Sequence, residues 1–348
     1  MSIKGFQLLG AREIAPAELP DPEPGAGEVL IEIERVGICG SDIEYYRHFQ
    51  CGVFVPKEPF VLGHEFAGTV VAQGHGVTEP RLGSRVAVEP SVPCGACRQC
   101  REGRYNLCDN IRFFGTAASH PHIDGGFREL VPAPVSNVFV LPEGVGPGEG
   151  ALLEPLAVAV HAVRRARPVD DTNILINGGG TIGQLVAMVA KAFGAGRITV
   201  SDPVEARRSF ALEHGVHAAV DPVADSLIDL GREESRGGWD IVFDASGQEQ
   251  AIAEGIGVVR KGGRFVQIGT IAKPITIPAN LIMVKELDFL GTFRYNHDFP
   301  AALTLLAERR IPAMDIVTKT FPFSESPQAF AAAASGAELK VHVELPNR

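Results

Sequence analysis

The chain has 348 residues, of which 45% are hydrophobic and 21% charged, a composition that is ordinary for a globular protein. At roughly 150 residues per domain, this length predicts about two domains, each able to bury a core. The formal net charge of −10 argues against a nucleic-acid partner, because proteins that follow a phosphate backbone present a basic face. No stretch approaches the ~20 apolar residues of a membrane span, and residues 1–20 lack a basic segment followed by an apolar run. We therefore expect a cytoplasmic protein with no membrane partner.

Residues 1–150 are predicted to form a mostly-β domain, because short alternating runs lie there between frequent glycines and prolines. The run 28–38 (EVLIEIERVGI) alternates well enough to be a strand, and the runs at 65–77 and 83–90 are bounded by glycine. No long amphipathic helix is expected in this part of the chain.

The pattern changes near residue 150, where apolar residues take helical spacing over 149–166. The stretch 173–203 then reads as strand, glycine turn, helix and strand, and one face of its helix is apolar. The residues of that face are Ile182, Leu185, Val186, Val189 and Phe193. Further helices are expected at 204–215 and 248–263, and further strands at 217–222, 239–247 and 264–270. Strands that alternate with helices predict a doubly wound parallel sheet of the α/β class.

A glycine-rich turn separates the first strand of this sheet from its helix. Gly178 can form the tight turn, Gly180 lets the backbone approach a pyrophosphate, and Gly183 allows the helix to pack closely on the strand. The helix N-terminus, at Thr181 and Ile182, offers N–H groups and a positive dipole end to phosphates. The turn therefore predicts a dinucleotide site, although a turn that binds another nucleotide, or none, has the same pattern.

Asp202 closes the next strand, 24 residues after Gly178. A carboxylate at this place accepts hydrogen bonds from both ribose hydroxyls and repels a 2′-phosphate, which favours NAD over NADP. Arg207 and Arg208 follow soon after and weaken this preference slightly, and Arg207 is itself a candidate cofactor contact.

Four of the six cysteines lie within residues 92–110 with the spacing C-x2-C-x2-C-x7-C; they are Cys94, Cys97, Cys100 and Cys108. Disulfides are unusual in a reducing compartment, and four thiolates this close can surround a tetrahedral Zn2+. Because four cysteines fill every coordination position, such a site is structural. Iron–sulfur ligation uses similar spacings and stays open as the less favoured alternative. A redox dithiol fits less well, because four thiols exceed what it needs.

A catalytic zinc needs about three protein ligands and one open position. Scattered candidates are Cys39 in GICGSD, His64 and Glu65 in LGHEFAG, and Glu154 in LLEPLAV. Each alone has a plainer reading, since a single cysteine is more often a buried hydrophobe and a lone His–Glu pair is more often on the surface. We give Cys51 that plainer reading.

The chain resembles a known family. Its motifs occur in the order typical of the medium-chain zinc-dependent alcohol and polyol dehydrogenases, over nearly the whole length. Besides the four-cysteine stretch, the motifs are GICGSD (37–42), VLGHEFAG (61–68), EPLAVAVHA (154–162), GGGTIG (178–183) and GTFRY (291–295). Within this family the chain resembles the sorbitol dehydrogenase branch. That branch has a glutamate where the simple alcohol dehydrogenases have a second thiolate, and it has an Arg–Tyr pair in the last motif. Residues 112–127 (RFFGTAASHPHIDGGF) are similar to bacterial L-idonate 5-dehydrogenases.

The resemblance implies a GroES-like, mostly-β catalytic domain at 1–154 and 290–348, with a structural zinc lobe at about 92–110. It implies a Rossmann cofactor domain, which binds NAD, at 155–289. It further implies two Zn2+ per chain, one catalytic and one structural, and a homo-oligomer, either a dimer or a tetramer.

The resemblance also implies roles for single residues. Cys39, His64 and Glu65 would hold the catalytic zinc, with Glu154 either a direct ligand or bonded to the zinc-bound water, and Ser41 would begin a proton relay. The lobe zinc would be held by Cys94, Cys97, Cys100 and Cys108. The substrate pocket would be lined by Tyr45, Phe113, Arg294 and Tyr295.

Two features lie outside that set. Many relatives carry a histidine where this chain has Glu44, so the relay beyond Ser41 stays open. His120 and His122 form an HxH pair, and with both metal sites accounted for we expect them in a loop or at a pocket rim.

The implied activity is reversible hydride transfer between NAD(H) and a secondary alcohol of a sugar acid or polyol. The match at 112–127 favours L-idonate, oxidised to 5-keto-gluconate, over a polyol 2-dehydrogenase of the sorbitol, xylitol or galactitol type. A zinc- and nucleotide-binding module without catalysis is the alternative from another class.

Overall fold

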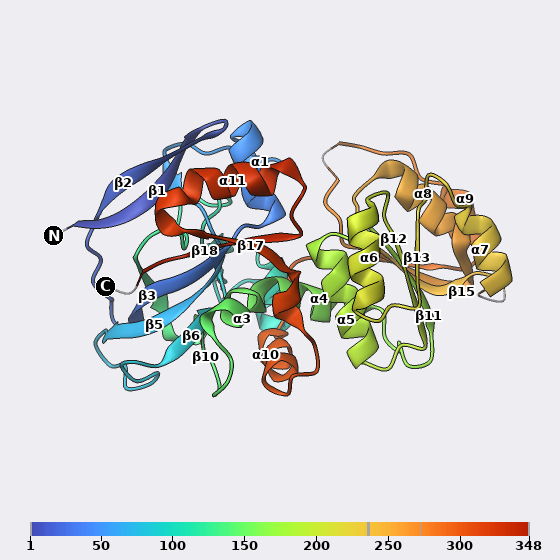
Figure 1. Cartoon of the computed structure of the whole chain (residues 1–348). Coiled ribbons are helices and arrows are strands. Elements are labelled where there is room, and N and C mark those ends of the chain that lie inside the picture. Colours follow the sequence, from blue (N-terminus) through green and yellow to red (C-terminus); the bar gives the residue numbers. More distant parts are fainter. Residues whose placement is uncertain (1, 235–236, 272, 347–348) are drawn as a thin grey trace. The chain divides into compact units, whose positions relative to one another are not determined.

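The computed structural model describes residues 2–234, 237–271 and 273–346. It forms two compact units, one of Met1–Glu154 with Ala302–Arg348 and one of Pro155–Ala301 (Figure 1). The chain re-enters the first unit at Ala302, and not near residue 290, because strand β16 (Asp288–Gly291) still pairs within the sheet of the second unit.

The first unit is built on β-strands. Its largest sheet has the order β10-β6-β5-β3-β18-β17, with β9 also paired to β3. These strands are β3 (Glu28–Gly37), β5 (Glu65–Gln73), β6 (Arg85–Val88), β9 (Leu130–Pro134), β10 (Val138–Val140), β17 (Val317–Pro322) and β18 (Lys340–Glu344). Smaller sheets join β1 (Ser2–Gly10), β2 (Glu13–Pro20) and β4 (Phe60–Val61), and β7 (Ser91–Val92) with β8 (Arg112–Phe113).

Short helices connect these strands. They are α1 (Gly40–His48), α2 (Arg98–Arg101), α3 (Pro147–Ala151) and α11 (Ser326–Ser335), with 3-10 turns η1 (Tyr105–Leu107), η2 (Val135–Asn137), η3 (Ala313–Ile316) and η4 (Phe323–Glu325). Helix α10 (Phe299–Ala307) crosses from the second unit into the first. The sequence pattern did not predict α1, because Asp42 and Tyr45 are its only fully buried side chains and leave no apolar stripe.

The centre of the large sheet places residues far apart in sequence side by side. Strand β3 alternates as predicted, and its Val29, Ile31 and Ile33 are buried. Strand β18, from the C-terminal region, lies between β3 and β17 and pairs with β3 so that His342 faces Gly37. Residues 340–344 thereby lie next to the end of β3, where the GICGSD motif begins.

The second unit is a doubly wound α/β fold, which confirms the expected parallel sheet. Its six strands run parallel in the order β13-β12-β11-β14-β15-β16. With β16 they are β11 (Asn173–Asn177), β12 (Arg197–Ser201), β13 (Ala218–Val220), β14 (Trp239–Asp244) and β15 (Val259–Gln267). The helices are α4 (Leu153–Arg165), α5 (Thr181–Ala192), α6 (Glu205–Glu213), α7 (Leu227–Glu234), α8 (Glu249–Val258) and α9 (Ala279–Val284). Helices α5 and α6 cover one face of the sheet and α8 and α9 the other (Figure 1).

Two expected helices were wrong in extent. The span 149–166 is broken at Leu152 between α3 and α4. The expected helix 248–263 ends at Val258, and β15 begins at Val259, ahead of the expected start at 264. Consecutive β-branched valines favour the extended backbone over another helical turn, which explains the early change.

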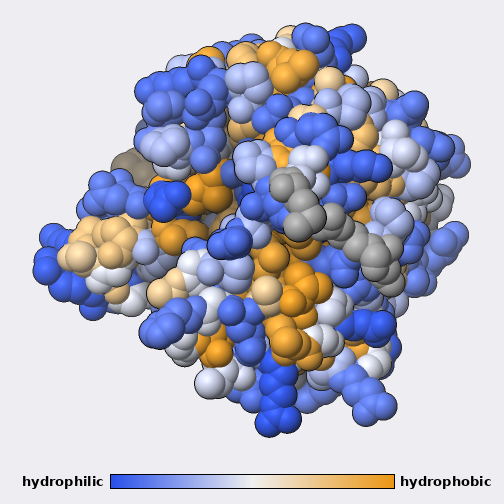
Figure 2. Space-filling model, turned by 90° about the vertical axis from the view of Figure 1, so that its left-hand side faces the viewer, coloured by the Kyte–Doolittle hydropathy of each residue, from blue (hydrophilic) through white to orange (hydrophobic). Residues whose placement is uncertain are grey.

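Within the described part of the chain, no helix is long and apolar enough to cross a membrane. A groove of about 970 Å3 lies between the β1–β2 hairpin and residues 320–328 of the first unit, and Phe6, Ala17 and Phe323 are among its lining. Figure 2 looks onto this side of the first unit, where hydrophobic patches alternate with hydrophilic side chains. None of the predicted site residues lines the groove.

Candidate metal centres and cofactor site

The four-cysteine lobe is one of two groups of potential metal ligands among the described residues. The Sγ atoms of Cys94, Cys97, Cys100 and Cys108 all lie within 4.8 Å of one another. Two of the pairs, Cys97–Cys100 and Cys94–Cys108, are 3.5 Å apart. Tetrahedral Zn–S bonds of about 2.3 Å need sulfurs about 3.8 Å apart, so the donor set fits zinc.

Backbone N–H groups prepare the lobe for a cation. The N–H groups of Ala96 and Cys97 lower the pKa of the Cys94 thiol to about 6. Burial and the neighbouring thiols instead raise the pKa of Cys100 to about 12. Thiols this close cannot all be ionised without a positive charge between them, so a metal would resolve the conflict.

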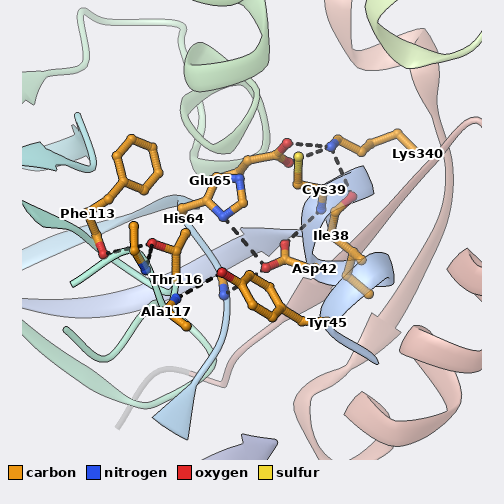
Figure 3. A network of polar contacts seen from close by, with 12 residues as sticks. Ile38, Cys39, Asp42, Tyr45, His64, Glu65, Phe113, Thr116, Ala117 and Lys340 are labelled. Atoms are coloured by element: carbon orange, nitrogen blue, oxygen red, sulfur yellow. Dashed lines mark hydrogen bonds and ion pairs between the residues drawn. The ribbon is translucent and has the colours of Figure 1, made fainter. Parts of the chain in front are cut away.

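The second group consists of Cys39, His64 and Glu65, whose ligand atoms also lie within 4.8 Å of one another (Figure 3). Cys39 follows β3 and is the N-cap of α1, and Glu65 begins β5 opposite Gly37. His64 and Glu65 are both buried. One thiolate, one imidazole and one carboxylate form the open, three-ligand set of a catalytic zinc.

Asp42 fixes the imidazole of His64. It is fully buried; its Oδ2 accepts the N–H of Cys39 at 2.9 Å, and its Oδ1 lies 3.6 Å from Nδ1 of His64 (Figure 3). Burial by itself would lower the pKa of His64, but Asp42 and Cys39 raise it well above the usual value. A carboxylate on Nδ1 leaves Nε2 for a metal. Asp42 ends the GICGSD motif, and sequence reasoning gave it no role.

Lys340 fixes the carboxylate of Glu65. Its Nζ lies 2.5 Å from Oε2 and 2.7 Å from Oε1 of Glu65, and it donates to the carbonyl of Ile38 at 3.0 Å (Figure 3). Burial would lower the pKa of Lys340, but Glu65 and Cys39 raise it. A Cβ at Gly37 would lie 2.2 Å from Oε2 of Glu65. Only glycine at this position in β3 therefore leaves room for the Glu65 carboxylate. Sequence reasoning missed Lys340 because it lies 275 positions after Glu65 along the chain.

Other predicted residues of the first unit lie near this centre. The ring of Phe113 is 5.6 Å from that of His64, and buried Tyr45 accepts the N–H of Ala117 at 3.0 Å through its hydroxyl (Figure 3). Glu154 is buried and close enough to raise the pKa of Lys340, but it is not in the three-residue group. Ser41 lies in the first turn of α1.

Cys51 and the HxH pair stay outside both groups. Burial, followed by nearby Cys39, raises the pKa of Cys51 to about 11, so its thiol is protonated at neutral pH. Nε2 of His122 accepts the N–H of Lys57 at 3.1 Å, and Nδ1 lies 2.6 Å from the carbonyl of Ser119. His120 lies 3.4 Å from Glu58. Both ring nitrogens of His122 are thus engaged by neighbouring backbone groups. We therefore interpret the HxH pair as part of the loop structure and not as metal ligands.

In the second unit, the glycine turn has the shape of a phosphate cradle. Gly178 has a φ of +93°, and a Cβ on Gly183 would lie 1.8 Å from the carbonyl of Gly178. A Cβ on Gly180 would meet nothing within 4 Å. Helix α5 begins at Thr181, with Ile182 next, so the N-terminal end of the helix directly follows the turn. The residues therefore fit a pyrophosphate.

Asp202 lies at the end of β12, buried beside this turn. Its Oδ2 accepts the N–H of Gly179 and its Oδ1 the N–H of Val204, both at 2.8 Å. Nη1 of Arg207 lies 3.5 Å from Oδ2. The backbone thus fixes the carboxylate; Oδ2 is also approached by Arg207, and Oδ1 keeps a second lone pair for a ribose hydroxyl.

Asp244 is a further buried carboxylate, which sequence reasoning missed. It ends β14 next to β11, where the strand order of the sheet reverses and where ligands of such sheets bind. Its oxygens accept from Ser246 at 2.6 Å, from Gly247 at 3.0 Å and from Gln267 at 2.8 Å. Burial raises its pKa. Asp244 therefore holds together the loops that follow β14 and β15.

The predicted substrate residues Arg294 and Tyr295 lie on the loop between β16 and α10. Tyr295 is fully buried, and Arg294 has a φ of +54°. Asp298 anchors this loop: it accepts from Nδ1 of His161 at 2.8 Å, from Arg164 at 2.5 Å and from the N–H of its own loop at residue 296 at 2.8 Å. Burial alone would raise the pKa of Asp298, but these hydrogen bonds outweigh burial and hold the pKa below its usual value.

Comparison with known proteins decides the family. Residues 25–143 match the family model described as alcohol dehydrogenase GroES-like domain, and residues 181–308 match zinc-binding dehydrogenase. The chain belongs to the zinc-dependent medium-chain dehydrogenases. The expected fold, a GroES-like unit with a Rossmann unit, is thereby confirmed, and family membership argues against a module without catalysis.

Two curated proteins and one crystal structure are similar to this dehydrogenase over nearly its whole length. It is 38% identical to a probable D-xylulose reductase A of Neosartorya fischeri, over 96% of this chain and 94% of the relative. It is 37% identical to a sorbitol dehydrogenase of Arabidopsis thaliana, over 93% of this chain and 90% of the relative. A crystal structure of L-idonate 5-dehydrogenase from Escherichia coli superposes with a TM-score of 0.93 at 32% identity, over 99% and 98%. By their names, these relatives act on D-xylulose, sorbitol and L-idonate, and this chain shares their zinc-dependent dehydrogenase family.

Proposed function

We propose that this dehydrogenase oxidises a secondary alcohol of a sugar acid, with L-idonate to 5-keto-gluconate as the first candidate and NAD as the hydride acceptor. The observation that carries the substrate is the place of residues 112–127, which resemble the L-idonate enzymes. Phe113 contacts His64, Asp124 accepts the N–H of Val61 at 2.8 Å, and Gly125 donates to the carbonyl of Val61 at 2.8 Å. This segment therefore borders the predicted metal ligands, where it would select a substrate.

Cys39, His64 and Glu65 would hold the catalytic zinc, with Glu154 nearby, and the lobe cysteines would hold the structural one. Bound there, Zn2+ would act as a Lewis acid and lower the pKa of an alcohol toward neutral pH. Asp42 and Lys340 keep His64 and Glu65 oriented. The hydroxyl proton would leave through Ser41 or through Glu154, and NAD would supply the hydride acceptor, so that a secondary alcohol and NAD would give a ketone, NADH and a proton.

Arg294 would pair with the carboxylate of a sugar acid, because its planar guanidinium matches that group. Asp298 supports this role by anchoring the loop that carries Arg294. Tyr45 of the first unit and Tyr295 of the second are further proposed substrate contacts. In the second unit, Gly178, Gly180, Thr181, Ile182 and Gly183 would bind the pyrophosphate, and Asp202 with Arg207 would bind the adenosine ribose.

A neutral polyol is the second candidate. The curated relatives at 37–38% identity are named D-xylulose reductase and sorbitol dehydrogenase, whereas the L-idonate enzyme is 32% identical. Arg294 does not decide between the two classes, because the resemblance implies the same arginine in enzymes that act on neutral polyols.

A dehydrogenation screen tests the proposal. The zinc-loaded enzyme is assayed with NAD and L-idonate, D-gluconate, sorbitol, xylitol and galactitol, and NADH absorbance is followed. We expect the highest kcat/KM with L-idonate. A higher value with xylitol or sorbitol would replace the sugar acid by the polyol as the substrate class.

We also propose a homo-oligomer joined through the second unit. Strand β16 is the outer strand of its sheet, and Met283, Val284, Phe289 and Phe293 on and near it are exposed in the single chain. An apolar edge strand favours pairing with a second copy. Light scattering should give a dimer or tetramer, and Phe289→Lys should shift it toward the monomer.

A further inference from the structure

Two arginines follow the predicted ribose acceptor, and each of them faces an acid. Nη1 of Arg207 lies 3.5 Å from Asp202 itself. Nη1 of Arg208 lies 3.1 Å from Oδ2 of Asp221, and it also donates to the carbonyl of Asp202 at 2.7 Å. The guanidinium of Arg208 is therefore within reach of the ribose pocket but is already paired.

The backbone holds Asp221 in place for this contact. It directly follows β13, and the neighbouring Val220 accepts the N–H of Asp202 at 3.2 Å, so the ends of β12 and β13 lie together. Oδ1 of Asp221 accepts the N–H of Val223 at 3.0 Å, which turns Oδ2 toward Arg208. The N–H of Asp221 donates to Asp225 at 3.1 Å. Asp221 thus presents one fixed oxygen to the guanidinium.

The chemistry at stake is the 2′-phosphate, the one group that NADP carries and NAD lacks. Guanidinium groups bind phosphate through charge-assisted hydrogen bonds, and an arginine beside the ribose is the usual means of accepting NADP. A carboxylate that occupies the guanidinium competes with the phosphate for the same N–H donors. The side chains of Arg208 and Asp221 are 19% and 27% exposed, so solvent weakens their pairing only in part.

We propose that Asp221 is a specificity-determining residue, which supports NAD over NADP by holding Arg208 away from a 2′-phosphate. The inference rests on the proposed cofactor site at Asp202. The two acids act differently. Asp202 accepts the N–H groups of Gly179 and Val204, so its loss would disturb the cradle for either cofactor. Loss of the Asp221 charge frees Arg208 and leaves that cradle intact.

The test is Asp221→Asn, with Kd values for NADH and NADPH measured by fluorescence titration of the zinc-loaded enzyme. We expect the Kd for NADPH to fall about tenfold, equivalent to about 1.4 kcal/mol, and that for NADH to change by less than about twofold. Asp225→Asn is the matched control: it removes one negative charge from the same turn, and Arg208 does not contact it in any described hydrogen bond or ion pair. That control should leave both Kd values within about twofold.

Two further variants keep the proposal open to refutation. The double variant Asp221→Asn with Arg208→Gln should lose the gain in NADPH affinity, and Arg208→Gln alone should change neither affinity by more than about twofold. An unchanged ratio in Asp221→Asn, with a melting curve like that of the wild type, overturns the inference. An equal gain in Asp225→Asn overturns it too, because net charge would then explain the effect. If the wild type binds neither NADH nor NADPH, the cofactor proposal itself fails; if it prefers NADPH, the role of Asp221 is refuted.

Discussion

The two groups of metal ligands differ in where their residues come from and in what holds them. The lobe takes its four thiols from residues 94–108, and backbone N–H groups donate to Cys94 and Cys108. The second group takes its ligands from two separate strand ends, and buried charged side chains hold it: Asp42 at His64 and Lys340 at Glu65.

Because of this difference, we expect substitutions in the two groups to have different effects on stability and on turnover. The lobe is a local loop that a metal closes, so losing one of its ligands should cost stability and leave the reaction largely intact. The second group is coupled to the core of the first unit through β18. A change there should therefore affect metal binding, turnover and folding together.

The largest effect is expected at Cys39. Cys39→Ser should lower kcat/KM by about 10³-fold, because a Lewis acid contributes several kcal/mol and each 1.4 kcal/mol is tenfold. Elemental analysis should show about one zinc per chain in place of about two. Cys51→Ser is the matched control, since its thiol is in neither group, and it should keep both zinc and turnover. Full activity in Cys39→Ser with a folded protein would remove the catalytic-zinc assignment.

A smaller but still large effect is expected at Lys340. In the zinc-free protein, Lys340→Met leaves Glu65 buried without a cation, which should lower the free energy of unfolding by about 3–5 kcal/mol. Denaturant titration at neutral pH measures it. Because the folded pKa of Lys340 is raised, its contribution is complete below its unfolded pKa of about 10.4 and is lost as the pH rises through the folded pKa.

The controls for Lys340 separate the pair from the charge. Lys319→Met removes an exposed lysine from the neighbouring strand β17 and should cost less than about 0.5 kcal/mol. Adding Glu65→Gln to Lys340→Met should recover part of the stability, because the unpaired charge is then gone. No recovery in the double variant would mean that Lys340 acts through packing and not through Glu65.

In the lobe, Cys100→Ser should lower Tm by roughly 5–10 °C, as expected for the loss of a structural metal. The kcat/KM at 25 °C should stay within about threefold of the wild type, since a closed site takes no part in the reaction. Calorimetry and steady-state kinetics on the same sample measure the two quantities. A loss of turnover as large as in Cys39→Ser would erase the distinction between the two groups.

The contrast also explains what the sequence could predict. The lobe was readable from spacing alone, because its ligands are neighbours in the chain. The Rossmann turn with Asp202 was readable for the same reason, since one βαβ unit carries it. Cys39, His64 and Glu65 came together only through the family resemblance, because no local pattern joins residues 39 and 64.

The residues that hold the ligands were out of reach. Lys340 lies about 275 positions from Glu65 along the chain, and only the pairing of β18 with β3 brings the two together. Asp42 lay inside a quoted motif, but its role depends on the backbone of α1, a helix without an apolar stripe. Asp221 follows a strand that was predicted, yet its partner Arg208 comes from the helix before it. Long-range pairing and buried charge leave no periodic trace in a sequence.

The smallest expected effect concerns the order in which the thiols react once zinc has been removed by a chelator. A thiolate is the reactive form, and the pKa of Cys94 is about 6 whereas that of Cys51 is about 11. At pH 7.5, iodoacetamide should therefore modify Cys94 well before Cys51, as measured by peptide mass spectrometry over time. Zinc added back before the reagent should protect Cys94 and leave the slow rate of Cys51 unchanged, because only Cys94 belongs to a metal group. Rapid labelling of Cys51, or zinc protection of it, would add a thiol to the second group and would blur the division between a local lobe and a core-coupled centre.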